Sequence, residues 1–165
     1  MDAWQRVDRA PLEEARAFLT QCCGSTRWVA RMLERRPFGS DAELLAAARS
    51  EWFALSADDW REAFSHHPKI GDREALRVRF PTTADLSANE QRGVTGASEA
   101  TLDALSAGNR AYEEKFGYIF IVCATGKTAD EMLGLLNRRL ANDSTTEILI
   151  AAEEQARITA LRLCR

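Results

Sequence analysis

The chain has 165 residues, of which 45% are hydrophobic and 28% are charged, and its formal net charge is −3. A chain of this length can bury about two thirds of the surface that its unfolded form exposes, so one domain over residues 1–165 needs no disulfide or metal to fold. This composition excludes a disordered or membrane protein, and the charge balance gives no basic surface for nucleic acid.

The cysteines and the terminal sequences indicate the cellular compartment in which the protein is expected. Neither C-x-x-C spacing nor a zinc-finger interval to histidine occurs among the four cysteines, Cys22, Cys23, Cys123 and Cys164. We expect them to be reduced, buried thiols. The N-terminal sequence lacks the apolar core of a signal peptide, no run approaches the ~18 apolar residues of a membrane helix, and the last residues are not a peroxisomal address. A cytoplasmic location is the expectation.

Apolar residues recur at helical spacing between only four prolines and nine glycines, and this pattern predicts an all-α fold. The first helix is expected to begin at Pro11, a good first-turn residue, and to end at Gly24. Ser25 and Ser40 have the side chains of N-cap residues and should open the next two helices. Three amphipathic helices should therefore fill the chain up to Ser56.

Ser56 opens a short fourth helix, with Asp59 at the position where a capping box prefers Glu or Gln. This helix should end at His66-His67-Pro68, because the residue before a proline is driven out of the α region. Residues 69–86 are expected to be an irregular loop with room for a short helix through Arg73 to Arg77. A loop of this length within one domain more often has a function than serves only as a connection.

The second half of the chain contains its one β-rich run. Ser87-Ala88-Asn89-Glu90 is a capping-box pattern for another short helix. A long helix is expected from Ser98 to Phe116, closed by Gly117. The run from Tyr118 to Ala124 has the length of a strand, yet one strand has no partner in a helical chain. We therefore expect a buried extended segment that passes through the core.

Two further helices complete the predicted fold. Thr128 and Glu131 form a second capping box, and the last helix should begin at Asp143 or Ser144. With no internal repeat or linker in the sequence, the prediction is a single helical bundle of about seven to nine helices with one buried extended segment.

The only two histidines, His66 and His67, are adjacent at the predicted helix end before Pro68. Histidine exchanges protons near neutral pH, so this pair is a candidate for proton transfer. Near a helix C-terminus, a histidine taken singly is more often a cap that interacts with the helix dipole. A metal site that adds Asp72 and a cysteine is disfavoured, because adjacent residues rarely project toward one ion. Proton transfer and capping both stay open.

Other polar candidates also have ordinary structural explanations. The capping box accounts for Ser87 and Glu90, and Gln91 beside them would by default be a surface amide. Arg162 lies on the inward edge of the last helix by its spacing, but a cation in a last turn also interacts favourably with the helix dipole. These residue patterns alone do not show whether the side chains have a structural role or a role in binding and catalysis.

Six stretches, in order along nearly the whole chain, resemble the family of 2-oxo-4-hydroxy-4-carboxy-5-ureidoimidazoline (OHCU) decarboxylases. They are Cys22–Val29, Arg36–Phe38, His67–Gly71, Ser87–Gln91, Lys115–Ala124 and Arg157–Leu163. The resemblance implies a single all-helical domain that converts OHCU to (S)-allantoin, the last step from urate to allantoin in purine catabolism. It also implies a homodimer with no metal or organic cofactor, a small-molecule substrate, and no nucleic-acid or membrane partner.

The same resemblance implies the site residues. His67 would be the proton donor or shuttle, with Pro68 fixing the chain beside it. Glu90 would accept hydrogen bonds from substrate N–H groups, and Gln91 and Ser87 would add polar contacts. Arg162 would orient the substrate carboxylate, with Arg157 as the alternative. Backbone groups would be contributed by Ile119, Phe120, Ile121, Val122 and Cys123.

Two alternatives compete with this hypothesis. An all-helical domain with amphipathic helices can be an interaction module without catalytic activity, since a fold alone does not prove function. A second alternative is an enzyme for a related ureido or hydantoin substrate, which the same histidine, glutamate and glutamine could serve.

Overall fold

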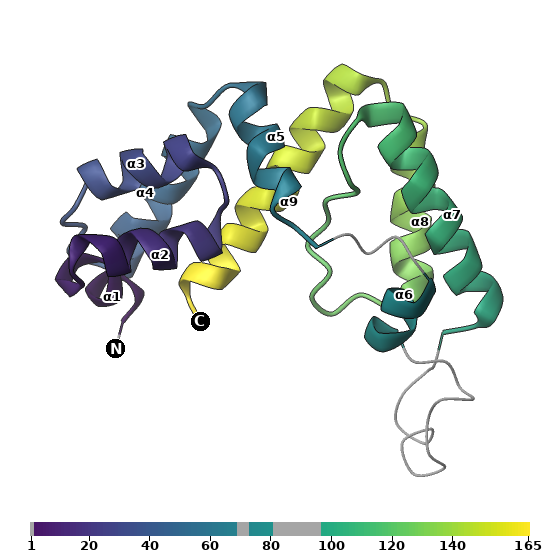
Figure 1. Cartoon of the computed structure of the whole chain (residues 1–165), viewed down its shortest axis with the longest axis horizontal. Coiled ribbons are helices and arrows are strands. Elements are labelled where there is room, and N and C mark those ends of the chain that lie inside the picture. Colours follow the sequence, from purple (N-terminus) through teal and green to yellow (C-terminus); the bar gives the residue numbers. More distant parts are fainter. Residues whose placement is uncertain (1, 69–72, 81–96) are drawn as a thin grey trace, which may run out of the picture. The chain divides into compact units, whose positions relative to one another are not determined.

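The computed structural model describes residues 2–68, 73–80 and 97–165 (Figure 1). The described residues form nine α-helices and no β-strand, which confirms the predicted all-α class and helix number. The helices are α1 (Ala3–Arg9), α2 (Leu12–Cys22), α3 (Thr26–Glu34), α4 (Asp41–Phe53), α5 (Ala57–Ser65), α6 (Arg73–Arg79), α7 (Glu99–Phe116), α8 (Ala129–Leu140) and α9 (Ser144–Leu163).

Residue contacts divide the chain into two units. The first unit consists of Met1–His67, Ile121–Cys123 and Ile148–Arg165, and the second of Pro68–Phe120 and Ala124–Glu147. One domain over residues 1–165 stays a prediction. None of the described helices has the length and apolar character needed to cross a membrane.

Local capping explains most of the helix starts. The hydroxyls of Ser25, Ser40 and Ser56 each accept a backbone N–H three residues on, as predicted. Asp59 completes the capping box with Ser56, although aspartate is the less common residue there. Cap chemistry was therefore a sound guide to where α3, α4 and α5 begin.

Helix α2 confirms the helix expected from Pro11, which is its N-cap residue, but it is not the first helix, because α1 precedes it. Asp2 makes no side-chain capping bond at the start of α1. Instead, the backbone N–H of Trp4 donates to Asp41 Oδ1 at the start of α4, at 2.8 Å. The start of α1 is thus held by a contact between two residues that are 37 positions apart, which the spacing of neighbouring residues does not predict.

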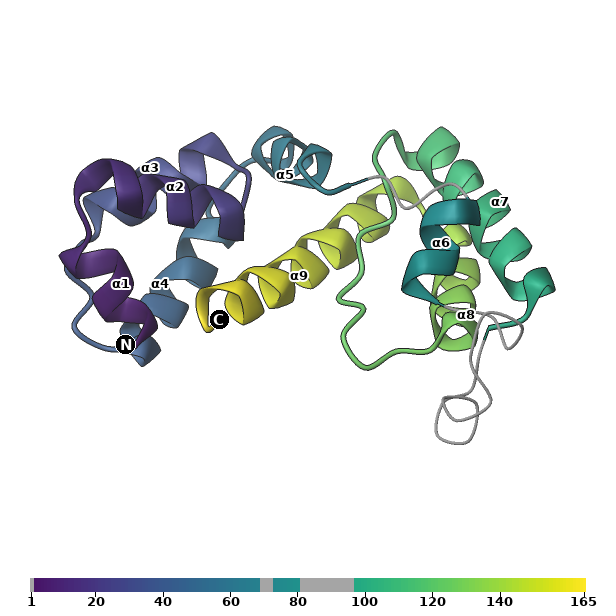
Figure 2. The ribbon, with the colours of Figure 1, turned by 60° about the horizontal axis from the view of Figure 1, so that its bottom comes forward.

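Three buried tryptophans form much of the core of the first unit, where α1 to α5 pack against one another (Figures 1 and 2). Each indole N–H donates to a backbone carbonyl: Trp28 to Ala48 O at 3.0 Å, Trp52 to Ala152 O at 2.8 Å, and Trp60 to Trp52 O at 2.9 Å. A buried indole needs such a partner. The Trp52 bond fixes α9 against α4.

In the second unit, α7 packs against α8 and α6 (Figure 2). Helix α7 ends at Gly117, whose φ of 81° lies in the left-handed region that glycine tolerates. Thr128 and Glu131 form the predicted capping box of α8. Helix α6 confirms the short helix expected from Arg73, whereas the helix expected from Ser87 lies outside the described residues.

The β-rich run from Tyr118 to Ala124 forms neither a helix nor a strand, and Tyr118 lies in a bend. Tyr118 and Ile121 are buried. Within the first unit, the backbone N–H of Cys123 donates to Glu154 Oε2 of α9 at 2.6 Å. A helix side chain thus pairs with one backbone group of this segment.

Candidate active site

The predicted break at the histidine pair is confirmed. His66 is the C-cap of α5, and the backbone N–H groups of His66 and His67 donate to Ala63 O at 3.2 Å and Phe64 O at 3.3 Å. Both histidines therefore close the last turn of α5 before Pro68. His66 is exposed and His67 is half-buried, so the two rings have different surroundings.

The His66 ring packs against the backbone of Gly24, between α2 and α3. A Cβ atom on Gly24 would lie 2.4 Å from His66 Cγ, closer than real Cβ contacts allow. Gly24 is therefore required for the close approach of these two segments. This packing agrees with the structural role expected of His66.

The His67 ring faces a buried glutamine of α9. Its Nε2 atom lies 2.5 Å from Gln155 Oε1, and Gln155 Nε2 lies 3.1 Å from Thr159 Oγ1. Thr159 in turn donates to the Cys22 carbonyl at 3.5 Å. We call His67, Gln155, Thr159 and Cys22 the relay. It connects the end of α5 to the end of α2 through one face of α9.

The surroundings of His67 favour its neutral form. Burial lowers the pKa of His67 below its ordinary value of 6.5, and electrostatic interactions with Arg162 and His66 lower it further. The hydrogen bond to Gln155 works in the opposite direction. The net effect is a lowered pKa, so His67 is a neutral imidazole near pH 7 and can accept a proton.

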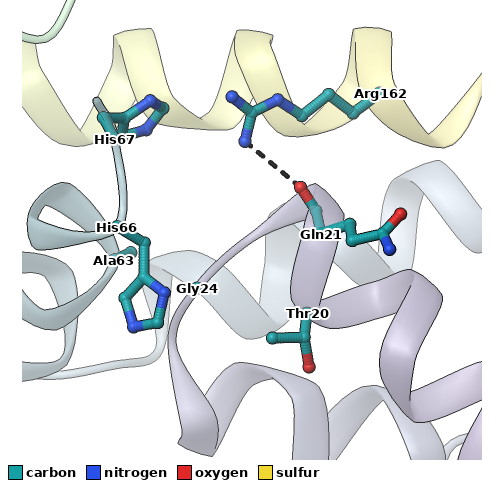
Figure 3. A pocket seen from close by; sticks show the side chains of 7 residues that line it. All are labelled: Thr20, Gln21, Gly24, Ala63, His66, His67 and Arg162. Atoms are coloured by element: carbon teal, nitrogen blue, oxygen red, sulfur yellow. Dashed lines mark hydrogen bonds between the residues drawn. The ribbon is translucent and has the colours of Figure 1, made fainter.

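His67 and Arg162 line a pocket of about 360 Å³. Figure 3 shows the Arg162 guanidinium pointing toward the His67 ring, while the His66 ring is turned toward Gly24. The Arg162 Nη1 atom donates to Gln21 O at 3.3 Å and to Cys22 O at 3.4 Å, which holds the cation in place. The full lining is Thr20, Gln21, Gly24, Ala63, His66, His67 and Arg162.

This arrangement suits a small anion. Ligand pockets typically occupy about 300–1,000 Å³, so this one can hold a small ring compound. A guanidinium can orient a carboxylate through parallel N–H donors, and the neutral imidazole beside it can accept and return a proton. Within the described residues, no group of three or more His, Cys, Asp or Glu side chains is placed to hold a metal ion.

The two arginines considered for the substrate carboxylate have different positions. Arg157 is exposed and forms an ion pair with Glu154 at 2.8 Å. Arg162 is half-buried, lines the pocket and pairs with none of the described carboxylates. The geometry favours Arg162.

The remaining predicted site residues fall into three groups. Ile121, Val122 and Cys123 belong to the first unit together with His67 and Arg162. Three others belong to the second unit, namely Pro68, Ile119 and Phe120. A last group lies outside the described residues, namely Ser87, Glu90 and Gln91.

Gln155 is the residue beside His67 that sequence reasoning did not select. Gln155 lies in α9, and the structure shows its side chain fully buried. A polar amide on an otherwise apolar helix face was the signal, because such a group needs hydrogen-bond partners inside the protein. Thr20 and Gln21 gave no signal, since both are ordinary polar residues at the end of α2.

The expectation of four buried cysteines was wrong for two of them. Cys22 and Cys23 are buried, whereas Cys123 is half-buried and Cys164 is exposed, and all four are free thiols. Burial raises the pKa of Cys22 to about 11 and that of Cys23 to about 12. Both thiols near the pocket therefore stay protonated and are poor nucleophiles.

Comparison with known proteins gives a consistent result. The sequence profile of the family described as OHCU decarboxylase matches residues 8–164. The chain is 37% identical to the Arabidopsis thaliana "Uric acid degradation bifunctional protein TTL" over 87% of this chain and 44% of that protein. It is 29% identical to the Haloferax volcanii "2-oxo-4-hydroxy-4-carboxy-5-ureidoimidazoline decarboxylase", over 82% of this chain and 79% of the relative.

A solved structure agrees with these sequence matches. The "Crystal structure of OHCU decarboxylase in the presence of (S)-allantoin" has a TM-score of 0.70 and 35% identity to this chain. The similarity covers 93% of this chain and 96% of that one. With the profile match over nearly every residue, the chain belongs to the OHCU decarboxylase family.

Proposed function

We propose that this chain decarboxylates OHCU to (S)-allantoin without a cofactor, as the last step of urate breakdown to allantoin. The observation that carries the proposal is the pocket in which neutral His67 lies beside the Arg162 cation, in a member of this family. Decarboxylation of this substrate needs a carboxylate-binding cation and a group that moves protons, and the pocket offers both.

The chemistry of the substrate explains why these groups suffice. The ring carbon that bears the carboxylate and a hydroxyl lies next to a C=N carbon that bears the ureido group. When the carbon–carboxylate bond breaks, its electron pair moves toward the imine and CO2 leaves. The imine nitrogen, which received the electron pair, takes up a proton from water. The enol-like intermediate then loses its hydroxyl proton and gains a proton on the neighbouring carbon, so one proton is taken up overall as CO2 leaves. The substrate is thus its own electron sink.

His67 acts as the acid/base in this scheme. As a neutral imidazole it accepts the hydroxyl proton, and as the resulting cation it returns a proton to one face of the ring. Arg162 orients the carboxylate in the bound substrate. If Arg162 bound the carboxylate so tightly that it stabilised the bound substrate, it would oppose the loss of CO2. The role of Arg162 is therefore to orient the bound substrate.

The other predicted residues complete the proposal. Glu90 accepts hydrogen bonds from substrate N–H groups, while Gln91 and Ser87 add polar contacts to the ureido group. The segment from Ile119 to Cys123 presents backbone groups, and Pro68 fixes the direction in which the chain leaves α5. These roles rest on the family resemblance.

The reaction tests the proposal directly. Fresh substrate is generated from urate by urate oxidase and hydroxyisourate hydrolase, and allantoin formation is followed by circular dichroism with and without this protein. We expect fast formation of optically active (S)-allantoin. A rate and an optical signal equal to those of the spontaneous, racemising reaction would contradict the proposal.

A binding measurement separates catalysis from a purely structural role. If (S)-allantoin binds the folded pocket, it raises the unfolding temperature of the protein. A non-catalytic interaction module predicts no such shift. Parallel assays with related ureido and hydantoin compounds test the alternative that the pocket serves another substrate of this class.

We also propose that the chain works as a homodimer, which rests on the family resemblance. Sedimentation equilibrium should give twice the mass of one chain, and a mass of one chain at micromolar concentration would contradict it. A cytoplasmic location stays a prediction from the sequence.

A further inference from the structure

The relay is a chain of hydrogen bonds beside the pocket, and the donor and the acceptor of each bond can be assigned. Gln155 lies on α9 with its side chain fully buried, and a buried amide costs free energy unless both of its ends are paired. Both ends are paired here, with His67 Nε2 at 2.5 Å on one side and Thr159 Oγ1 at 3.1 Å on the other. The amide therefore has a fixed position between the catalytic candidate and the core.

The orientation of the amide follows from its far end. The Thr159 hydroxyl has acceptors on its far side, namely the Cys22 carbonyl at 3.5 Å and the sulfur of Cys23, and its proton points toward them. Its one proton is then used, so its oxygen accepts from Gln155, and the Gln155 NH2 group faces Thr159. The Gln155 carbonyl oxygen consequently faces His67, and a carbonyl oxygen needs a donor opposite it. A flipped amide would lose the bond from Thr159 to Cys22.

We infer that Gln155, oriented by Thr159, is a positioning residue that holds neutral His67 with its proton on Nε2 and so leaves Nδ1 as the nitrogen that exchanges protons with the substrate. The inference rests on the proposed function for the identity of the substrate, whereas the tautomer belongs to the free protein. The other charged or titratable groups facing His67 are Arg162 on α9 and His66 at the end of α5.

The state of His67 can be read by nitrogen-15 NMR of the free protein, because the chain has only two histidines. His66→Asn assigns the signals. We expect neutral His67 with a protonated Nε2, an unprotonated Nδ1, and an Nε2 proton that exchanges slowly with water because Gln155 holds it. A proton on Nδ1, or an Nε2 proton that exchanges as fast as that of exposed His66, would overturn the inference.

Two substitutions at Gln155 separate hydrogen bonding from packing. Gln155→Glu keeps the shape and an oxygen that accepts, so slow exchange of the Nε2 proton should persist and the pKa of His67 should rise. Gln155→Met fills similar volume without an acceptor, so slow exchange should be lost. If Gln155→Met leaves the exchange rate and tautomer of His67 unchanged, Gln155 does not position the ring.

A matched pair at Thr159 tests the orientation of the amide. Thr159→Ser keeps the hydroxyl, and Thr159→Val removes it with little change of shape. We expect slow exchange of the His67 Nε2 proton in the serine variant and faster exchange in the valine variant. Equal behaviour of the two variants would show that Thr159 does not orient Gln155.

Kinetics connect the tautomer to the reaction. Gln155→Met should lower kcat by roughly ten- to a hundredfold, the cost seen when a partner that orients a metal-bound histidine is removed, with little change in KM. An unchanged kcat would overturn the positioning role. If the wild-type protein has no activity but NMR still shows the proton of His67 on Nε2, the proposed function is wrong, whereas the positioning of His67 by Gln155 is still supported. Circular dichroism confirms that each variant is folded.

Discussion

Two polar clusters in this chain differ in how deeply they are buried. In the second unit, the carboxylate of Glu147 accepts hydrogen bonds from Tyr112, from Arg139 Nε at 2.7 Å and from Asn142 at 3.0 Å. Glu147 is fully buried and Arg139 nearly so. In the first unit, His67 and Arg162 are only half-buried and line a pocket.

The difference separates the polar groups around Glu147 from the pair that we propose to be reactive. Glu147, Tyr112, Arg139 and Asn142, which we call the Glu147 cluster, form hydrogen bonds with one another. The Arg139 guanidinium also lies 4.6 Å from the centroid of the Phe120 ring. Burial and the bond to Glu147 raise the pKa of Tyr112, so this phenol does not ionise near neutral pH. His67 has one nitrogen paired with Gln155 and lines a pocket. Burial of charge alone therefore does not mark the reactive site.

The largest expected effect is on catalysis. His67→Asn removes the acid/base and should lower kcat by about 10²–10⁴-fold, the typical contribution of such a group. The midpoint of urea unfolding should change little, because an amide of similar size replaces the ring. His66→Asn is the matched control and should keep most of the activity. A rate within twofold of wild type for His67→Asn would remove His67 from the mechanism.

The next largest effect is on stability. Glu147→Gln leaves the buried Arg139 cation without its counter-ion and should lower the free energy of unfolding by roughly 3–5 kcal/mol. Urea unfolding followed by circular dichroism measures this change. A loss below about 1 kcal/mol would show that the cluster does not stabilise the fold.

A smaller effect is expected at the carboxylate-binding position. Arg162→Gln removes a charge-assisted hydrogen bond to substrate and should lower kcat/KM by roughly ten- to a hundredfold. It should also raise the pKa of His67, because a nearby positive charge is lost. Arg157→Gln is the control, since Arg157 pairs with Glu154 at the surface. Equal losses in the two variants would contradict the assignment to Arg162.

The lowered pKa of His67 predicts a modest pH dependence of stability. Below the ordinary histidine pKa of 6.5, the unfolded chain binds a proton at His67 that the folded chain does not yet bind. Stability therefore rises with pH in this window and is lost as the pH falls toward the folded pKa. Urea unfolding at pH 7 and pH 5 should show a smaller loss in His67→Asn than in wild type. Equal losses would mean that the His67 pKa is not lowered.

The smallest effect is expected for an exposed ion pair. Glu153→Gln breaks the paired contacts to Arg49, both at 3.0 Å, on the surface of the first unit. Such pairs contribute at most about 1 kcal/mol, so the unfolding free energy should change by less than that. A loss as large as that of Glu147→Gln would show that burial does not distinguish the two carboxylates.

The sequence predicted those parts of the fold that local chemistry decides. The caps at Ser25, Ser56 and Thr128, the break after His67 and the non-helical run after Gly117 all depend on residues close in sequence. Helix α1 was missed because the Trp4 to Asp41 bond that holds its start is long-range.

The site shows the same division. Resemblance selected His67 and Arg162, which the structure brings to one pocket. Gln155 was not selected, because its partner His67 is 88 residues away and only folding pairs them. The different exposure of His66 and His67 also depends on tertiary contacts, since the two residues are identical in type and adjacent.

The most direct test of the reactive-site assignment is a titration with (S)-allantoin followed by NMR of the histidine and tyrosine side chains. We predict saturable shifts of the His67 imidazole signals and unchanged signals from Tyr112 in the Glu147 cluster. Saturable shifts at Tyr112 with unchanged His67 signals would place the ligand elsewhere and contradict the assignment.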